Sequence, residues 1–513
     1  MGRRVALLPA SLLFATLSAP SLFAADLYWD ADGATSNGTA VTGAWNGTNA
    51  FWNTDATGAA AGSASAVTTL DDNLFFSAGT TYTSGTVTLS GTAAANRITF
   101  QEGPITVGGT SGTLQLGAGG VTFTGTSASH LGASSGSTFS LSLQANTVFT
   151  TNNTATATSG DAAASQSINS SITGSFGITK TGAGNLVLRG ASTYTGATII
   201  NQGSIFMGGS AVLGASTGAL ELHNTNTTLA GNHVRLTLNG AAVTKGSLSG
   251  TVAAAPSGTN RTIIDLNNRA LTINQTVNGT YAGEIINAPG SGGTFTLGAL
   301  STARLTMAGN TSYTGATTVN AGTLEIGATG AVNSSSGVTV NGGSFIYNAT
   351  TALTKAVTVN STGTVGGTKT LAGVTVNAGG FVSPGDGGAG TLTASSLTWN
   401  SNGTTGGFNF DLGLDAASSD KLAITGAFTQ GTGSTFVFNF NDVGAQSITY
   451  TLVTFGSTTF GDASVFSATG VDGTFAFAGN SLTFTVTAIP EPSTYAAILG
   501  GLVLAGVVYR RRR

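Results

Sequence analysis

The sequence predicts an all-β fold, an elongated right-handed parallel β-helix, and three observations lead to this prediction. Segments such as 184–189 and 433–440 alternate apolar residues with small or polar ones, which is the two-residue period of half-buried strands. Glycine, asparagine and aspartate interrupt these segments every few residues, while the chain holds 77 glycines and only 8 prolines. The third observation is a short strand that ends in asparagine and recurs along the chain.

The recurring strands end at Asn320, Asn341, Asn360 and Asn377, which lie 21, 19 and 17 residues apart. A β-helix needs one such strand in each coil, with valine facing inward and asparagine and glycine at a tight, left-handed corner. Coils stacked ~4.8 Å apart would then place the asparagines in a ladder of amide hydrogen bonds. An antiparallel sandwich is the alternative, but it would show hairpin turns every 8–12 residues without asparagines in phase.

Residues 1–25 are predicted to be a signal peptide. Arg3 and Arg4 form a basic start, residues 5–17 are apolar, and Ala24 and Ala25 are small residues at which cleavage can occur. This signal helix would direct the chain to the Sec export machinery, so the mature chain would begin near Ala25 or Asp26.

Residues 26–60 are predicted to form an N-terminal cap, because a solenoid needs a cover over its open end. Three of the four tryptophans, Trp29, Trp45 and Trp52, lie in this segment. The alternative is that their rings stack on sugars, which would make the segment a binding site.

Residues 61–395 are assigned to the coils, with the clearest repeat units at 172–208 and 300–327. The first unit reads Lys-Thr-Gly-Ala-Gly-Asn-Leu-Val-Leu from Lys180 and continues to Tyr-Thr-Gly-Ala-Thr from Tyr194. The second has Tyr-Thr-Gly-Ala-Thr from Tyr313, but residues 300–304 lack the lysine and the glycines. These motifs resemble the autotransporter-associated β-strand repeat, which implies a β-helix of exported proteins and no particular chemistry.

Residues 396–488 are predicted to be a closing β region, which holds Trp399 and phenylalanine-rich strands. Residues 494–509 are uncharged and would form a single transmembrane helix of ~24 Å, slightly under the ~30 Å hydrocarbon core. The cluster that follows would hold this end in the cytoplasm, and it consists of Arg510, Arg511, Arg512 and Arg513. The alternative is a terminal helix buried in a globular domain, but the four arginines that follow it could not enter a core.

The tripeptide Pro490-Glu491-Pro492 precedes this apolar segment, and proline keeps the chain extended there. Together, residues 489–513 resemble the PEP-CTERM sorting signal of Gram-negative bacteria. The resemblance implies that an exosortase reads Pro490, Glu491 and Pro492 at the periplasmic face and that the helix is later removed. The inner membrane would then hold the precursor only transiently, before release to the cell surface or extracellular matrix. The alternative is that Pro492 simply begins the helix.

Composition excludes several kinds of function. Charged residues make up 7% of the chain and the net charge is −3, so no electrostatic footprint for nucleic acid exists. Cysteine is absent, which excludes disulfides and thiolate metal sites. The acidic pairs at Asp30 with Asp32 and at Asp71 with Asp72 lack the ligands of a calcium loop and are interpreted as turns. We expect no catalytic, cofactor or metal site.

Two functions of different classes remain. The first is a non-catalytic exported surface or matrix protein, adhesin-like or associated with exopolysaccharide, that binds sugar or neighbouring proteins through flat faces rich in threonine, serine and asparagine. The second is a polysaccharide lyase or glycosidase built on the same scaffold. Asp265, Arg261 and Arg269 lie close in sequence but need not converge. A three-dimensional cluster of carboxylates with an arginine in a groove would favour the enzyme; we favour the surface protein.

Overall fold

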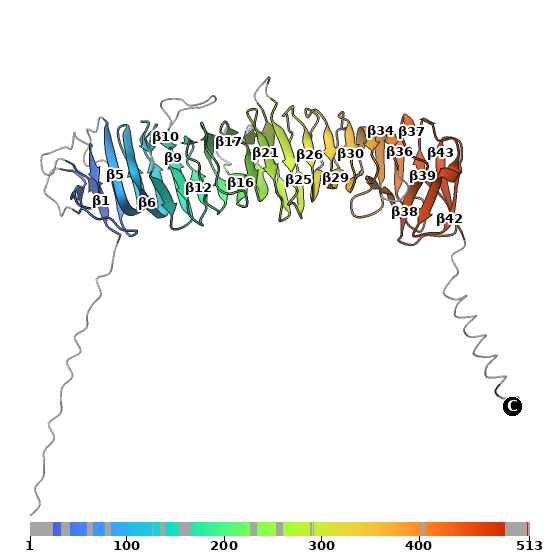
Figure 1. Cartoon of the computed structure of the whole chain (residues 1–513), viewed down its shortest axis with the longest axis horizontal. Coiled ribbons are helices and arrows are strands. Elements are labelled where there is room, and N and C mark those ends of the chain that lie inside the picture. The colour runs from blue at the N-terminus through green and yellow to red at the C-terminus, as the bar shows by residue number, and fades with distance from the viewer. Residues whose placement is uncertain are drawn as a thin grey trace, which may run out of the picture.

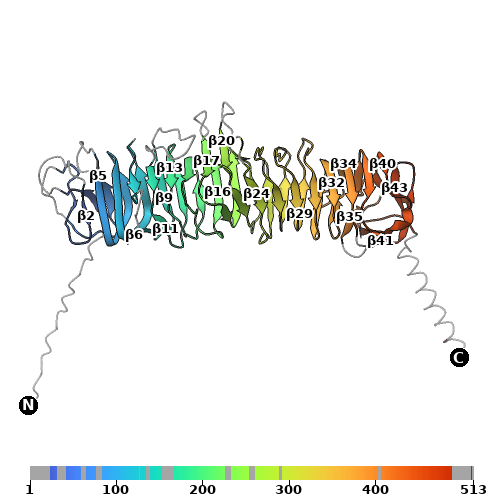
Figure 2. The same cartoon turned by 45° about the horizontal axis from the view of Figure 1, so that its top comes forward.

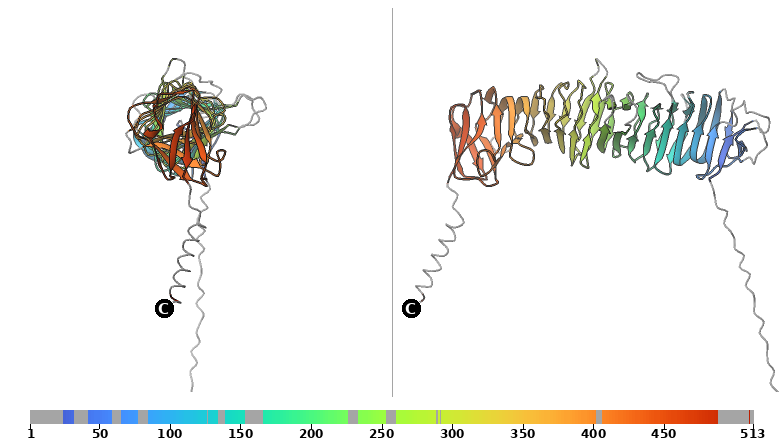
Figure 3. Two further views of the ribbon diagram at one scale, coloured as in Figure 1. Left: turned by 90° about the vertical axis from the view of Figure 1, so that its right-hand side faces the viewer. Right: turned by 180° about the vertical axis from the view of Figure 1, so that it is seen from behind.

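The structure is a computed structural model, and it describes residues 24–31, 42–58, 65–76, 84–125, 127–133, 139–152, 166–225, 233–252, 260–287, 290, 292–401, 406–487 and 510. These residues form a long rod whose strands run across its axis (Figure 1), and the rotated view in Figure 2 shows the same stacking. Seen along the axis, the coils superimpose into one closed outline (Figure 3). The strands belong to two sheets.

The first sheet contains 29 strands. They are β1 (Asp26–Trp29), β2 (Gly43–Trp45), β3 (Trp52–Asn53), β4 (Asn73–Phe76), β5 (Gly85–Phe100), β6 (Ile105–Phe123), β7 (His130–Leu131), β8 (Ser140–Leu143), β9 (Thr147–Thr151), β10 (Gln166–Ile168), β11 (Ser171–Thr173), β12 (Ile178–Thr181), β13 (Asn185–Leu188), β14 (Thr198–Ile200), β15 (Gly203–Met207), β16 (Ala219–Asn224), β17 (His233–Leu238), β19 (Ser247–Val252), β20 (Arg261–Asp265), β22 (Gly279–Tyr281), β23 (Glu284–Ile286), β25 (Arg304–Met307), β27 (Thr323–Ile326), β29 (Gly343–Tyr347), β31 (Gly363–Gly367), β33 (Phe381–Pro384), β35 (Gly407–Leu412), β38 (Phe436–Asp442) and β41 (Phe466–Thr469).

The second sheet contains 14 strands. They are β18 (Val243–Lys245), β21 (Ala270–Ile273), β24 (Thr294–Leu297), β26 (Thr317–Val319), β28 (Val338–Val340), β30 (Val357–Val359), β32 (Thr370–Val376), β34 (Thr391–Trp399), β36 (Lys421–Ile424), β37 (Ala427–Gln430), β39 (Thr449–Thr454), β40 (Ser457–Thr458), β42 (Gly473–Phe477) and β43 (Ser481–Val486). A single 3-10 turn, η1 (Ala463–Val465), completes the regular elements of the described residues.

Parallel pairing between successive coils dominates both sheets. Among the described strands, only the pairs β1–β3, β39–β43 and β42–β43 are antiparallel. This all-β architecture of long parallel sheets agrees with the predicted β-helix; its right-handed sense stays a prediction. Parallel pairs occur as early as β1–β4 and as late as β38–β41, beyond the range of 61–395 that the sequence suggested for the coils.

The alternation of the sequence places one side chain inside and the next outside. In β28, Val338 and Val340 are buried while Thr339 between them is half-buried, and the same pattern occurs in β26 and β30. Glycine makes the corner after β26 and β28: Gly343 has a φ of 65°, and a Cβ there would lie 2.2 Å from the carbonyl oxygen of Gly322. After β30 the same position is Thr362, with a φ of 68°. The asparagines of these corners are not among the described residues with positive φ, so they do not take the left-handed conformation that we had assigned to asparagine and glycine together.

The N-terminal end is filled by aromatic side chains. Trp29, Trp45 and Trp52 are 1%, 2% and 0% exposed. Trp29 and Trp45 pack edge-to-face against Trp52, which packs edge-to-face against Phe76. Rings buried this completely cannot stack on a sugar, so the alternative interpretation of this segment as a sugar site is wrong. The rings close the end of the core instead.

Candidate binding face

A single row of threonines runs along the outer surface of the second sheet. Each is an outward residue of its strand and stands in register with the threonine of the next coil. The row consists of Thr244, Thr272, Thr296, Thr318, Thr339, Thr358, Thr375, Thr398 and Thr429. All nine are half-buried, as expected of outward residues that are flanked by the neighbouring strands of a sheet. We call this surface the threonine row.

The hydroxyls of the threonine row are free for a ligand. Among the described residues, none of the nine hydroxyls makes a hydrogen bond to another protein group, whereas some outward threonines of the first sheet do. Thr306, on β25 of the first sheet, donates to a carboxylate oxygen of Glu325 over 2.8 Å, and Thr150 bonds Thr181 over 2.8 Å. The row therefore offers both a donor and an acceptor in every coil.

An asparagine ladder runs beside the threonine row, two residues further along each strand. The side-chain Nδ2 of each asparagine donates to the Oδ1 of the one before it, at 3.0 Å from Asn341 to Asn320, 2.8 Å from Asn360 to Asn341, 2.7 Å from Asn377 to Asn360 and 3.0 Å from Asn400 to Asn377. The predicted ladder is confirmed, and it extends one coil further, to Asn400.

The ion pairs of the described residues lie on the first sheet and on a loop that folds back onto it. Asp265 pairs with Arg235 of the preceding coil, and Arg261 bonds Glu284 of the following coil over 2.8 Å. The guanidinium of Arg269 is 3.5 Å from the carbonyl oxygen of Asn239. The three residues that the sequence placed close together, Asp265, Arg261 and Arg269, therefore have separate partners and form no joint site.

One cluster does combine two carboxylates with an arginine. Arg304 binds Glu325 over 3.2 Å and also binds Asp386, which reaches back from the loop after β33. Asn348 donates to both acids, over 3.1 Å to Glu325 and 2.9 Å to Asp386. The hydrogen bonds and charge of Arg304 lower the pKa of Asp386, so this acid is held ionised.

The residues that define the repeat motif are structural. The ammonium group of Lys180 is fully buried and donates to the carbonyl oxygens of Thr181, Gly182 and Gln202 over 2.7, 2.8 and 3.2 Å, which ties one corner to the next. Burial lowers its pKa to about 7. Tyr194 and Tyr313, at matching positions of the two units, are fully buried, and each bonds a threonine hydroxyl four residues later over 2.6 Å. The motif thus explains coil geometry.

Metal-binding clusters of three or more His, Asp or Glu side chains are absent from the described ranges. His130, on β7, bonds Ser167 over 2.7 Å, and His223 lies 3.2 Å from Glu221 of the same strand, β16. Asp72 accepts from the backbone N–H of Thr69 over 2.7 Å, as expected of a turn residue.

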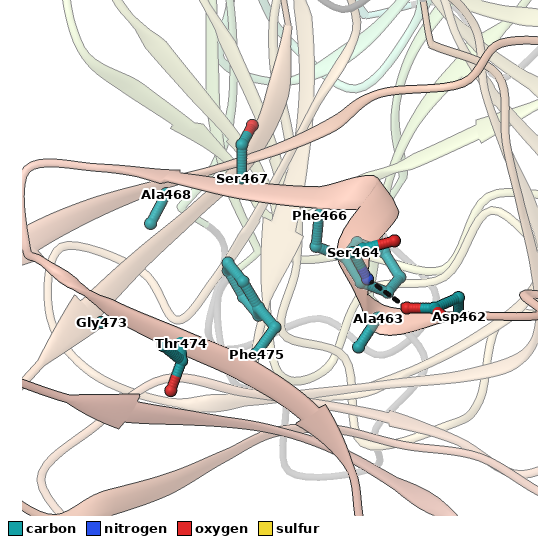
Figure 4. A pocket seen from close by; sticks show the side chains of 9 residues that line it. All are labelled: Asp462, Ala463, Ser464, Phe466, Ser467, Ala468, Gly473, Thr474 and Phe475. Carbon is teal, nitrogen blue, oxygen red and sulfur yellow. Dashed lines mark hydrogen bonds between the residues drawn. The ribbon is translucent and has the colours of Figure 1, made fainter.

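A shallow depression near the C-terminal end lies between β41 and β42 and has a volume of about 390 Å³ (Figure 4). Its only titratable residue is Asp462, whose carboxylate accepts from the N–H of Ser464 over 2.7 Å and caps η1. That bond lowers the pKa of Asp462, so the depression holds no group suited to proton transfer.

The residues predicted for sorting mostly lie outside the described residues. Pro490, Glu491, Pro492, most of the signal peptide, the segment 494–509 and three of the four terminal arginines are in the part not described. The part that is described contains no helix with the length and apolar character needed to cross a membrane. Ala24 and Ala25 directly precede β1, and the carbonyl oxygen of Ala25 accepts from Asn73 over 2.8 Å.

Comparison with known families identifies both motifs. The model of the PEP-CTERM protein-sorting motif matches residues 488–513, and the model of the passenger-associated-transport-repeat matches residues 178–205 and 300–326. The chain therefore carries a PEP-CTERM sorting motif and autotransporter-type repeats, as the resemblances predicted.

A curated relative comes from Brucella suis biovar 1 (strain 1330). The chain is 32% identical over 240 residues to its "Adhesin BmaC autotransporter". The match covers 45% of this chain and 6% of the adhesin, so it compares a stretch of rod with a small part of a much longer protein.

Proposed function

We propose that this chain is a non-catalytic, adhesin-like surface protein that is exported and then sorted by an exosortase to the cell surface or extracellular matrix of a Gram-negative bacterium. The observation that carries the proposal is the combination of a PEP-CTERM motif at 488–513 with a rod that is similar in sequence to an autotransporter adhesin. A rod of stacked coils extends a binding surface away from the cell and offers few loops to proteases.

The geometry of the Arg304 cluster supports a role without catalysis. A glycosidase needs one carboxylic acid that keeps its proton and a second, ionised carboxylate. In the Arg304 cluster, Asp386 is ionised and both acids are bonded to Arg304 and Asn348, so neither is placed to donate a proton. A polysaccharide-active enzyme, the alternative function, therefore gains no support from this cluster.

The proposed route to the surface uses both ends of the chain. The Sec machinery would export the precursor, cleavage after Ala24 or Ala25 would release it at the first residues of β1, and the segment 494–509 with its arginines would hold it in the inner membrane. An exosortase would then recognise Pro490, Glu491 and Pro492 and remove the tail. The surface form would associate with exopolysaccharide.

Replacement of Glu491 by alanine tests the sorting step. We expect Glu491→Ala to leave full-length protein in the inner membrane, because the intact apolar segment and its arginines remain. Ile498→Leu, which keeps the apolar character of the segment, should leave sorting unchanged. Mass spectrometry of surface material measures the result. A peptide that spans residues 493–508 in the surface form of the unaltered protein would contradict removal of the tail.

A further inference from the structure

The threonine row and the asparagine ladder together form a flat, neutral surface with a strict repeat along the rod axis. Nine coils contribute one threonine each, and neighbouring strands of a sheet lie ~4.8 Å apart, so the row is about 38 Å long. The outward residues two positions before each threonine are no larger than threonine: Ala242, Ala270, Thr294, Ala316, Gly337, Ala356, Gly373, Ser396 and Ala427. Those two positions after it are asparagine or glycine. No charged or aromatic side chain interrupts these three columns.

The asparagines of the ladder keep part of their hydrogen-bonding capacity. A side-chain amide has two donor hydrogens and two acceptor lone pairs. The three interior members, Asn341, Asn360 and Asn377, each use one donor and one acceptor within the ladder. One N–H and one lone pair of each therefore remain for a ligand, in addition to the threonine hydroxyl of the same coil.

We propose that this surface binds a neutral, extended polysaccharide whose chain lies along the rod axis over the threonine row. The inference rests on the proposed function, because it takes the extracellular polysaccharide of the surface protein as the ligand. The strand spacing of ~4.8 Å is roughly the length of one sugar unit, so successive sugars meet successive coils. Each sugar hydroxyl can both donate and accept, which matches what each coil offers.

Other classes of ligand fit this surface less well. Nucleic acids require lysine or arginine, and the three columns hold none. A second copy of the chain would need a larger contact: the surface measures about 500 Å² from its strand spacing and width, against ~800 Å² per partner in a stable interface. It also lacks the aromatic and arginine side chains that anchor protein interfaces.

The proposal makes a prediction about ligand length. Because every coil contributes a similar weak contact, affinity should rise with the number of sugar units until the ligand covers the nine-threonine row. We would measure binding of the full-length protein in detergent to neutral β-1,4-linked xylo-oligosaccharides of increasing length. An affinity that does not depend on length would overturn the proposal.

Matched variants locate the site. In the triple variant Thr318→Val, Thr339→Val and Thr358→Val, three hydroxyls are lost while a strand-forming side chain of similar shape remains. We expect affinity for the longest oligosaccharide to fall by tenfold or more. The control triple variant Thr179→Val, Thr280→Val and Thr364→Val removes outward hydroxyls from the first sheet. It should bind like the unaltered protein. Equal loss in both variants would contradict the assignment of the site.

Two further outcomes separate this inference from the proposed function. If the unaltered protein binds no xylo-oligosaccharide but shapes ice crystals, the regular hydroxyls recognise ordered water and the polysaccharide proposal is wrong, while sorting to the surface is unaffected. If the protein binds the oligosaccharides in vitro yet stays at the inner membrane of cells, the proposed sorting is wrong and the binding site stands.

Discussion

From β18 onward the two sheets of the rod share the same coils but carry different outer surfaces. The first sheet bears the ion pairs of the described residues, such as Arg235 with Asp265 and Arg261 with Glu284. In the strands of the second sheet the charged residues are Lys245, which is buried, and Lys421. Its outward residues are instead a continuous row of threonine beside a ladder of asparagine.

The difference follows from what a side chain meets in a stack of parallel coils. An outward residue lies directly above the residue at the same position of the previous coil. A side-chain amide has both a hydrogen-bond donor and an acceptor, so asparagines at the same position of successive coils can hydrogen-bond one another along a whole column. Identical charges repel, so a charged position needs an opposite charge in the next coil. Neutral columns can therefore be long and periodic, while ionic contacts stay local pairs.

The largest effect is expected from a charge placed on the inner side of the second sheet. Val340 is fully buried, so Val340→Asp puts a carboxylate into the core, and we expect a loss of more than about 4 kcal/mol in the free energy of unfolding, enough to prevent folding. Thr339→Asp changes the neighbouring outward residue and should cost about 1 kcal/mol or less. Urea unfolding followed by circular dichroism measures both. Similar losses in the two variants would contradict the inside–outside assignment.

The free energy of unfolding is expected to depend on pH because of Asp420, which directly precedes β36 of the second sheet. Asp420 is almost fully buried, and burial, with the nearby charge of Asp411, raises its pKa from 3.8 to about 7. Between pH 3.8 and about 7, the folded protein therefore keeps this proton on Asp420, whereas the unfolded chain has released it. The free energy of unfolding should therefore fall as pH rises from 4 to 7, by about 1.4 kcal/mol for each unit of pKa difference.

The control for this effect is Asp420→Asn, which cannot titrate. Its absolute stability will also differ, because the carboxylate accepts from the N–H groups of Gly390 and Asp411 over 2.7 and 2.8 Å. The decisive measurement is the slope of stability against pH, which should be flatter in the variant. Parallel curves for the two proteins would show that Asp420 does not titrate in this range.

A smaller effect is expected from the ladder itself. Asn360→Ala removes two amide bonds and should cost about 2 kcal/mol, while Asn320→Ala, at the end of the ladder, removes one and should cost about 1 kcal/mol. Arg261→Gln, which breaks an exposed pair of the first sheet, should cost at most about 1 kcal/mol and nothing in 1 M salt. If the asparagine variants responded to salt as strongly as the arginine variant, the proposed difference between the sheets would fail.

The sequence by itself determined the fold class and the ladder. Period-two alternation in segments such as 338–340 indicates strands, and asparagines at 320, 341, 360 and 377 can stay in phase only if each coil returns to the same corner. The alternation is a local pattern and the asparagine spacing is a periodic one, so both can be recognised in a single sequence. The sorting motif could also be identified from the sequence, because it is a short contiguous segment in which Pro-Glu-Pro, an apolar stretch and arginines follow one another.

The tertiary structure decided which outward residues share a column, because coil lengths vary and the register cannot be counted from spacing alone. Thr272 and Thr296 are 24 residues apart, Thr358 and Thr375 only 17, yet all stand in one row. The partner of Arg304 is 82 residues away in Asp386, which no local pattern indicates. The burial of Trp29, Trp45 and Trp52 was likewise a matter of packing, since the same rings in an open coil would have been exposed to solvent.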